Sequence, residues 1–317
     1  MRSVLMNVSY RMLGSVADAE DAVQEAYARW YALPEDRRRE VPSPTGWLVT
    51  TVSRICLDVL RSARARRERY VGPWLPEPVP GTARWTSQSP LPADPADRLT
   101  LDESVSMALL IVCESMTPAE RVAFILHDVF RYPYAEIAAI VGRSPQACRQ
   151  LASSARHRAR EVSPDRTPGA EHARLVAAFK NAWETGNLEA LIEKLDPAAT
   201  AVTDGGGLVS ASLEPITGAE PVASFLLGVF RRQPDLTISE TTVNGRPGLL
   251  TRARETQMAV ITLEAKGGRV EKLWVVRNPE KLSAWRAGAE WRRSSPRSAR
   301  PSRCPRSGGG PAVPGSR

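Results

Sequence analysis

Apolar side chains recur at intervals of three and four residues over the first part of the chain, which is the spacing of an amphipathic helix. A polar loop, residues 34–46, separates two such apolar stripes. The first stripe consists of Val16, Ala19, Val23, Tyr27 and Trp30, and the second of Leu48, Val52, Ile55 and Val59. We therefore expect residues 1–72 to form one all-helical module.

Residues 73–98 break this pattern with prolines and polar residues, which are typical of a linker. Helical spacing resumes at Leu99, with an apolar stripe at Val105, Leu109, Val112 and Met116. The run Thr117-Pro118-Ala119-Glu120 is a capping box with proline at the first helical position, which indicates a helix start. These features predict a second all-helical module, residues 99–163.

Within that module, residues 134–160 have the pattern of two helices joined at Val141-Gly142-Arg143. Ser144 can cap the second helix, and Pro145 suits its first turn. The apolar positions expected to pack inward are Ile137, Ile140 and Val141 on the first helix, and Ala147, Cys148, Leu151 and Ala155 on the second. The pattern is typical of a helix-turn-helix, whose second helix lies in the major groove of DNA.

The outward face of the second helix carries side chains that can contact DNA, namely Gln146, Arg149, Gln150, Ser153, Arg156 and His157. Arginine pairs with guanine and glutamine with adenine, so Arg149 and Gln150 are the best candidates for base contacts. Arg143, Arg156 and Arg158 are better suited to phosphates. Taken alone, the same composition also fits an ordinary solvated basic helix.

From residue 170 the pattern changes to helices followed by strands. Amphipathic helices are expected before and after a strand that ends in Asp204-Gly205-Gly206-Gly207, and strands at about 235–243, 247–254, 257–265 and 269–277. This order predicts an α+β module, residues 170–283, with an antiparallel sheet. Residues 284–317 are rich in Arg, Ser, Pro and Gly, so we expect a disordered tail.

Composition narrows the function classes. The chain has 317 residues, a formal net charge of +8 and a pI near 9.7, which suits a polyanionic partner. Its cysteines, Cys56, Cys113, Cys148 and Cys304, are scattered without metal-ligand spacing, so we expect reduced thiols, no metal and no cofactor. No apolar run approaches the ~20 residues that span a bilayer, and no signal peptide is present. A cytoplasmic protein without a membrane partner is expected.

The order of these modules resembles the core of extracytoplasmic-function (ECF) sigma factors. Residues 10–15 (YRMLGS), 18–25 (DAEDAVQE) and 47–69 resemble sigma region 2, and residues 117–160 resemble sigma region 4. Three further motifs resemble the SigJ-like group, which carries a fused SnoaL-like domain. They are Trp74-Leu75-Pro76-Glu77-Pro78, Asp204-Gly205-Gly206-Gly207 and Asn278-Pro279-Glu280-Lys281-Leu282. The implied fold is two all-α sigma domains, then an α+β SnoaL/NTF2-like cone domain and the tail.

The resemblance implies binding of the RNA polymerase core and of promoter DNA. Region 2 would dock on the β′ clamp through an acidic helix face, and region 4 would contact the β flap. The docking face consists of Asp18, Asp21, Gln24 and Glu25. The helix from Trp47 would meet the −10 element, with Trp47 stacking on an unpaired base and with phosphate contacts from Arg54, Arg61 and Arg64. From the residues alone, a solvated surface is the better explanation of the acidic face, and Trp47 could equally be a core residue.

The third domain is expected to regulate rather than catalyse. Its candidate acid–base groups are few: His172, Asp204, Asp235 and Glu255, since every tyrosine lies at or before Tyr134. The resemblance implies that the three motifs contact one another, so the domain would grip the linker and bias the separation of the two sigma modules. An unknown small ligand in its pocket is a further expectation.

Two other protein classes stay open from the sequence. One is a one-component helix-turn-helix regulator with a small-ligand-sensing domain, which leaves residues 14–30 and 47–69 unexplained. The other is a SnoaL-like isomerase or hydrolase with a DNA-binding appendage, a reading that rests on fold analogy alone.

Overall fold

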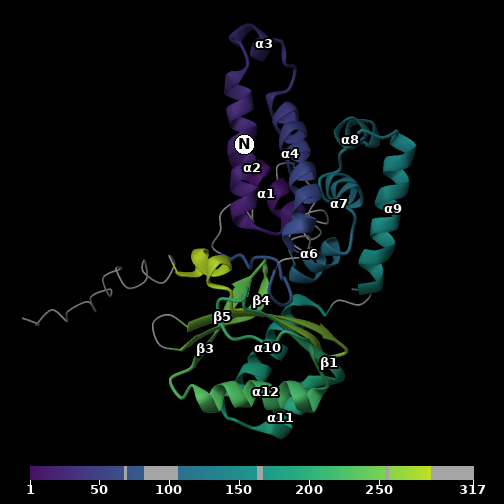
Figure 1. Cartoon of the computed structure of the whole chain (residues 1–317). Helices are drawn as coiled ribbons and strands as arrows, with labels where there is room; N and C mark the ends of the chain where they lie inside the picture. The colour runs from purple at the N-terminus through teal and green to yellow at the C-terminus, as the bar shows by residue number, and fades with distance from the viewer. Residues whose placement is uncertain (68–69, 82–105, 163–166, 254–256, 287–317) are drawn as a thin grey trace, which may run out of the picture.

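The computed structural model describes most of the chain: residues 1–67, 70–81, 106–162, 167–253 and 257–286. We call residues 1–67 the N-terminal module, residues 106–162 the helix-turn-helix module and residues 167–286 the third module. The two helical modules lie side by side, and both stand over the sheet of the third module (Figure 1). Among the described residues, no helix combines the length and apolarity that a bilayer span requires.

The N-terminal module is all-helical, as expected, with α1 Arg2–Leu13, α2 Val16–Ala32, α3 Glu35–Glu40 and α4 Pro44–Arg67. Ser15 caps α2, because its side chain accepts a hydrogen bond from the backbone N–H of Asp18 at 3.2 Å. The apolar stripes of α2 and α4 face each other and α1, and their buried residues include Val23, Val52 and Ile55.

The expected polar loop, residues 34–46, is partly helical. Glu35 and Asp36 lie in the first turn of α3 and three arginines in its last, an order that complements the helix dipole. Arg37 pairs with Glu40 along the same short helix. Because α3 buries no side chain, the periodicity of apolar residues gave no indication of it.

The helix-turn-helix module contains α6 Met107–Glu114, α7 Pro118–Phe124, a π-helical turn η1 Ile125–Val129, α8 Tyr134–Val141 and α9 Pro145–Val162. The expected helix start at Leu99 lies outside the described residues. The capping box is formed as predicted: the Glu120 N–H donates to the Thr117 side chain at 3.3 Å, and the Thr117 N–H donates to Glu120 Oε2 at 2.8 Å.

A left-handed glycine separates α8 from α9. Gly142 has φ 73°, which a side chain would oppose, and Ser144 Oγ then accepts from the Ala147 N–H at 3.2 Å. On α9, Cys148, Ala152 and Ala155 are the buried positions. Leu151 is half-buried and packs against the same core, as expected, and its neighbour Ala152 is fully buried beside it.

The third module is an α+β fold built on one sheet. Its elements are α10 Gly169–Glu184, α11 Leu188–Lys194, β1 Leu195–Asp204, β2 Ile216–Thr217, α12 Ala219–Arg232, β3 Thr237–Val243, β4 Arg246–Ala253, β5 Gln257–Lys266, β6 Arg269–Val276 and a 3₁₀ helix η2 Pro279–Leu282. The strand order is β2-β1-β6-β5-β4-β3. The expectation of a purely antiparallel sheet was wrong, because β1 pairs with β6 in parallel. Only β3 to β6 are joined by hairpins, which force antiparallel pairing.

The sheet buries side chains on both faces. One face packs against α10, α11 and α12 through residues such as Leu249, Ile261 and Leu273. Alternate residues of the same strands, among them Leu250, Val260 and Trp274, form a second cluster on the opposite face. That second cluster includes Leu75, Met107, Leu282 and Trp285, which come from the linker, from α6 and from the end of the described chain. The sheet is therefore the surface on which the linker rests.

The ordered chain extends past the expected start of the tail at residue 284. Residues 283–286 are helical, and Trp285 is buried, with its indole N–H donating to the Pro78 carbonyl at 2.8 Å. Trp285 was the indication in the sequence that this part of the chain is ordered, but the Arg/Ser/Pro-rich composition around it led to the prediction of a tail. The rest of the expected disordered tail, residues 287–317, lies outside the described residues.

Candidate functional site

Asp204 lies at the end of β1 and forms the centre of a buried polar cluster. Its side chain is fully buried and accepts hydrogen bonds from the Tyr70 hydroxyl at 2.5 Å, the Leu75 N–H at 2.9 Å and Lys281 Nζ at 2.7 Å. Tyr70 and Leu75 belong to the linker region, whereas Asp204 and Lys281 belong to the third module. We call these four residues, with Asn278, the Asp204 cluster. A buried carboxylate is stabilised only when it is paired in this way.

Lys281 brings the positive charge to this cluster. Besides Asp204, its ammonium group donates to the Leu75 carbonyl at 2.6 Å. It also lies 4.8 Å from the centre of the Tyr70 ring and 4.2 Å from that of the Trp74 ring. Aromatic faces attract a desolvated cation, so both rings add to the ion pair. Lys281 thus contacts Tyr70 and Trp74 through cation–π interactions and Leu75 through a hydrogen bond.

The glycines after Asp204 let the backbone approach its neighbours closely. Gly206 has φ 60°, and a Cβ at this position would lie 2.4 Å from Asn278 Nδ2. A Cβ at Gly205 would lie 2.5 Å from the Val209 carbonyl oxygen. Gly207 lies against Val71 in the same way. The motif at residues 204–207 is therefore a steric requirement of the contact with residues 70–75 and 278.

The motif at residues 278–282 positions Lys281. Asn278 Oδ1 accepts from the Glu280 N–H at 2.9 Å, and Pro279 occupies the first position of η2. The other end of the Asn278 amide donates to the Tyr70 hydroxyl at 2.8 Å, and its backbone N–H donates to the Asp204 carbonyl at 3.0 Å. Asn278 therefore fixes the position of η2 relative to the end of β1.

A second polar cluster joins the third module to α1. Asn244, at the β3–β4 turn, accepts from the Val79 N–H at 2.8 Å and donates to the Tyr10 hydroxyl at 2.8 Å. The Tyr10 hydroxyl in turn donates to the Glu77 carbonyl at 2.6 Å. We call Tyr10, Glu77, Val79 and Asn244 the Asn244 cluster. One buried hydroxyl thus connects α1, the linker and the sheet, and burial raises the Tyr10 pKa.

Glu77 extends this connection to α2. Its side chain is 6% exposed, and Oε2 accepts from the Val16 N–H at the start of α2 at 2.7 Å. Burial raises the pKa of Glu77 from 4.5 to about 7, against the opposing effects of the Val16 N–H and Lys281. Glu20 and Asp18 on α2 add smaller upward shifts to the Glu77 pKa. Glu77 was predicted as a linker contact, but its place at the start of α2 was not.

Leu75 is the apolar anchor of the linker. It is buried in the second sheet cluster, whereas its neighbour Trp74 is half-buried beside Lys281. Pro76 lies against Gly14, and Pro78 accepts the Trp285 N–H. Tyr10, Tyr70, Asn244 and Trp285 contribute to the linker contacts without having been predicted as site residues.

The two helical modules also pack directly on each other. Arg54 Nη2 on α4 donates to the Ala139 carbonyl on α8 at 3.0 Å, and Arg121 Nη1 on α7 donates to the Met12 carbonyl at the end of α1 at 3.0 Å. Their apolar residues form one continuous cluster. The structure is therefore a closed arrangement, in which both helical modules and the linker rest together on the sheet.

Residues 1–66 match the family model for sigma-70 region 2, and residues 107–158 match the model for sigma-70 region 4. Over 297 residues the chain is 37% identical to the ECF RNA polymerase sigma factor SigJ of Mycobacterium tuberculosis (strain ATCC 25618 / H37Rv), a match that covers 89% of this chain and 91% of the relative. The chain belongs to the ECF RNA polymerase sigma factors.

Two further comparisons agree with this membership. The probable ECF RNA polymerase sigma factor SigI of Mycobacterium tuberculosis (strain CDC 1551 / Oshkosh) is 35% identical over 291 residues, covering 90% of this chain and 93% of the relative. The crystal structure of Mycobacterium tuberculosis SigJ superposes with a TM-score of 0.69 at 32% identity, covering 89% of this chain and 96% of that one. The predicted family, and with it the function of a transcription initiation factor, is confirmed, and the one-component regulator is not favoured.

In this sigma factor, the outward face of α9 is as the sequence placed it. Arg143, Gln146, Arg149, Gln150, Ser153 and His157 are exposed, and Arg156 is half-buried. The guanidinium of Arg149 lies 5.5 Å from the centre of the Tyr134 ring, which fixes its direction. Arg156 pairs with Asp128 at 3.3 Å, and Arg158 bonds Ser115 and Glu120. Both arginines therefore have protein partners in the closed arrangement.

The region 2 candidates have different surroundings. Asp21, Gln24 and Glu25 are exposed on α2, with Asp18 half-buried at its start. Trp47 packs on Trp30, with 5.2 Å between the ring centres, and is half-buried. This position is compatible both with a core residue and with a residue that stacks on a base. Arg61 pairs with Asp58 on the surface of α4. Arg64 lies on α4, but its side chain is outside the described part of the structure.

The candidate acid–base groups of the third module do not meet in a pocket. Asp204 is bound in its cluster, and His172 is fully buried with Nε2 3.1 Å from the Pro247 carbonyl. Asp235 is exposed, and Glu255 lies outside the described residues. The part of the chain that the structure describes contains no cluster of three or more His, Cys, Asp or Glu side chains able to hold a metal ion.

Proposed function

We propose that this sigma factor docks on the RNA polymerase core through the acidic face of α2 and recognises the −35 element through α9. The −10 element would lie along α4, with Trp47 and its neighbouring arginines on the DNA side. The observation that carries this proposal is α9 itself, whose Arg149 and Gln150 project outward from a glycine-hinged helix-turn-helix. Its partners would be the core, including the β′ clamp and the β flap, and promoter DNA in the cytoplasm.

Replacing Arg149 or Gln150 by alanine is expected to weaken recognition of one base pair each. A bidentate contact contributes about 1–3 kcal/mol, so affinity for the preferred −35 sequence should fall roughly 5- to 150-fold while affinity for other sequences changes less. Arg143→Ala is the matched control. Loss of a phosphate contact should reduce the salt dependence of binding and leave the sequence preference intact. Holoenzyme binding to −35 variants at several salt concentrations measures both effects. Equal losses on all sequences would contradict base recognition by Arg149.

We further propose that the third module regulates the sigma factor by holding the linker. The Asp204 and Asn244 clusters fix residues 70–79 against the sheet, while α6 packs on the same face through Met107. Recognition of two separate promoter elements requires the helical modules to part, whereas here Arg54 is engaged with α8. A module that favours the closed arrangement lowers the population competent for the core. This role needs contacts and no turnover.

A chain ending at residue 166 should therefore bind the core several-fold more tightly than the full chain and give a different level of promoter-specific transcription. The closed arrangement would lose its sheet support, so the open population should rise. A chain ending at residue 286 is the control, since it keeps every described contact of the third module. If the shortened chain shows unchanged core affinity and unchanged transcription, the regulatory proposal fails.

A further inference from the structure

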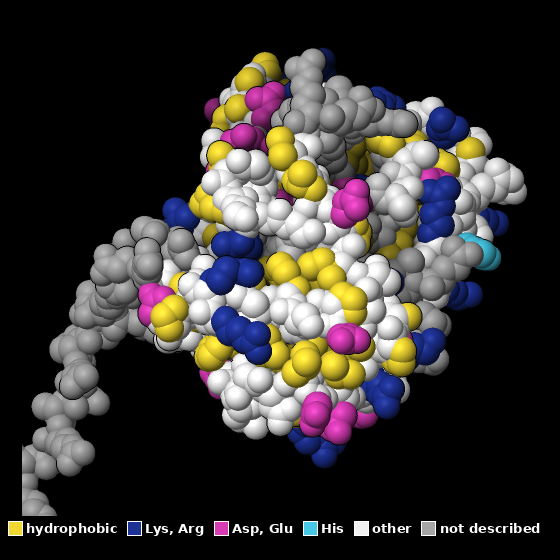
Figure 2. Space-filling model, turned by 60° about the horizontal axis from the view of Figure 1, so that its bottom comes forward, with side chains coloured by type: hydrophobic (Ala, Val, Ile, Leu, Met, Phe, Trp, Pro, Cys, Tyr) yellow, Lys and Arg dark blue, Asp and Glu magenta, His cyan; other side chains and the backbone are white. Residues whose placement is uncertain are grey.

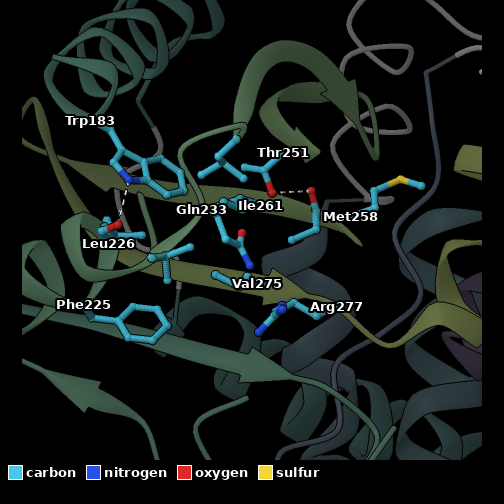
Figure 3. Close-up of a pocket in the computed structure, with 12 residues that line it drawn as sticks. Trp183, Phe225, Leu226, Gln233, Thr251, Met258, Ile261, Val275 and Arg277 are labelled. Carbon is cyan, nitrogen blue, oxygen red and sulfur yellow. Dashed lines mark hydrogen bonds between the residues drawn. The ribbon is translucent and has the colours of Figure 1, made fainter. Parts of the chain in front are cut away.

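We propose that the cavity of the third module is a binding site for a small aliphatic carboxylate, held by an ion pair with Arg277. The cavity lies between the helix side of the sheet and α12, and it is lined by Trp183, Phe225, Leu226, Val229, Leu236 and Ile261 among others. Figure 3 shows Arg277 and Gln233 beside each other, with Trp183 and Phe225 at the other side of the same space. The walls thus offer an apolar surface and one cation.

In the described part of the structure, the guanidinium of Arg277 has a neutral hydrogen-bond partner. Its guanidinium donates from Nη1 to the Ser210 carbonyl, a neutral acceptor, and no carboxylate of the described residues pairs with it. The side chain is half-buried, and desolvation lowers its pKa. A cation in an apolar wall is stabilised by an anion, and an arginine binds a carboxylate in two parallel hydrogen bonds.

The size of the cavity decides between a small and a large ligand. Its volume is about 50 Å³, a few times the ~10–15 Å³ that one water needs, whereas sites for drug-sized ligands have ~300–1,000 Å³. A polycyclic molecule does not fit in this arrangement. We expect a short alkyl chain to occupy the space between Phe225 and Trp183, with its carboxylate at Arg277. The described residues that line the cavity include no Asp, Glu, His or Tyr, so they support binding without acid–base chemistry.

Arg277 also connects this cavity to the Asp204 cluster. Its backbone N–H donates to the Asp204 carbonyl at 2.7 Å, and the next residue is Asn278 of that cluster. Its side chain holds Ser210, in the segment that follows the triple glycine. A carboxylate that binds the guanidinium therefore acts on the same backbone that holds the linker. This consequence, unlike binding itself, rests on the proposed regulatory function.

Titration calorimetry of the full chain with hexanoate and octanoate tests the site. Both acids should bind in the millimolar range or tighter, and hexanamide, which has the same chain without the charge, should bind at least tenfold more weakly. Arg277→Gln should reduce binding of the acids at least tenfold, and Arg277→Lys should reduce it less because the charge remains. Arg231→Gln, at an exposed arginine of α12, should bind like the native chain. Thermal melting of each variant verifies folding.

Three outcomes would overturn the proposal: neither acid binds below 10 mM, the amide binds as well as the acid, or Arg277→Gln and Arg277→Lys both retain full binding. Transcription with and without octanoate separates this proposal from the regulatory one. Binding without any change in transcription supports the site and contradicts its link to the linker. If the chain ending at residue 166 shows the regulatory effect but the full chain binds no carboxylate, the carboxylate site is contradicted and the regulatory proposal stands.

Discussion

Replacement of Asp204 by asparagine is expected to release the linker from the third module. The carboxylate is fully buried and accepts from Tyr70, Leu75 and Lys281, and the amide that replaces it presents an N–H₂ group to a cation. Lys281, whose side chain is 11% exposed, would lose Asp204 as its counter-ion. Breaking a buried ion pair from one side costs about 3–5 kcal/mol. The docked linker should therefore become less favourable by a factor of roughly 10² to 5 × 10³.

Hydrogen exchange at the Leu75 amide measures this release directly, because that N–H donates to Asp204 Oδ2. Its protection should fall by the same factor in Asp204→Asn, whereas Glu189→Gln, at an exposed carboxylate on α11, should leave it unchanged. Adding Lys281→Met to Asp204→Asn also removes the buried charge that has lost Asp204, so part of the protection should return. Unchanged protection in the single variant would show that the Asp204 cluster does not hold the linker.

The same variant separates structure from regulation. If the third module favours the closed arrangement, Asp204→Asn should increase core affinity in the direction that removal of the module does. A released linker with unchanged core affinity would mean that docking of the linker and docking on the polymerase are energetically independent. The contacts would then stabilise the chain without regulating it.

Much of this arrangement could be predicted because its key residues are contiguous. The predicted helix starts at Thr117 and Ser144 depend on local side-chain caps, and both caps are formed. The motifs at residues 74–78, 204–207 and 278–282 could be named for the same reason, and the structure brings all three together. The spacing of apolar residues shows which of them share a helix face, so the buried faces of α2 and α4 could also be predicted.

The missed residues depend on contacts between distant segments. Tyr10 and Asn244 are 234 positions apart, and each alone has an ordinary local explanation, as a helix residue and as the first residue of an Asn-Gly turn. The parallel pairing of β1 with β6 likewise depends on where α12 places the chain. Trp285 was assigned to the tail because the average composition around it cannot form a core, although one aromatic side chain sufficed to fill a site on the sheet.

The docking of the linker is expected to weaken as the pH rises from about 5 to 7. In the closed arrangement burial raises the pKa of Glu77 to about 7, and a released Glu77 in water would return toward 4.5. The closed form therefore binds the proton more tightly, so its advantage is complete below the lower pKa and is lost as the pH rises through the upper one. One proton changes the docking equilibrium by at most about tenfold per pH unit.

Glu77→Gln isolates this effect, because glutamine keeps an acceptor for the Val16 N–H and does not ionise. The melting temperature of the native chain should fall between pH 5 and pH 7 relative to that of Glu77→Gln, and the two curves should run parallel above about pH 7. His172, whose pKa burial lowers, is present in both proteins, so its contribution cancels in the difference. Curves that run parallel over the whole range would mean that Glu77 is already ionised in the closed form, held by the Val16 N–H and Lys281.

Such an outcome would also change the view of α2. An ionised Glu77 would add a negative charge at the start of the helix that carries Asp18 and Asp21, next to the proposed polymerase-docking face. A basic surface bound there would stabilise that charge, so core binding and linker docking would support each other. A protonated Glu77 has the opposite consequence: a basic partner on α2 favours ionisation, and ionisation disfavours the buried position. The pH dependence of the native chain therefore determines the sign of the coupling between polymerase docking and linker release.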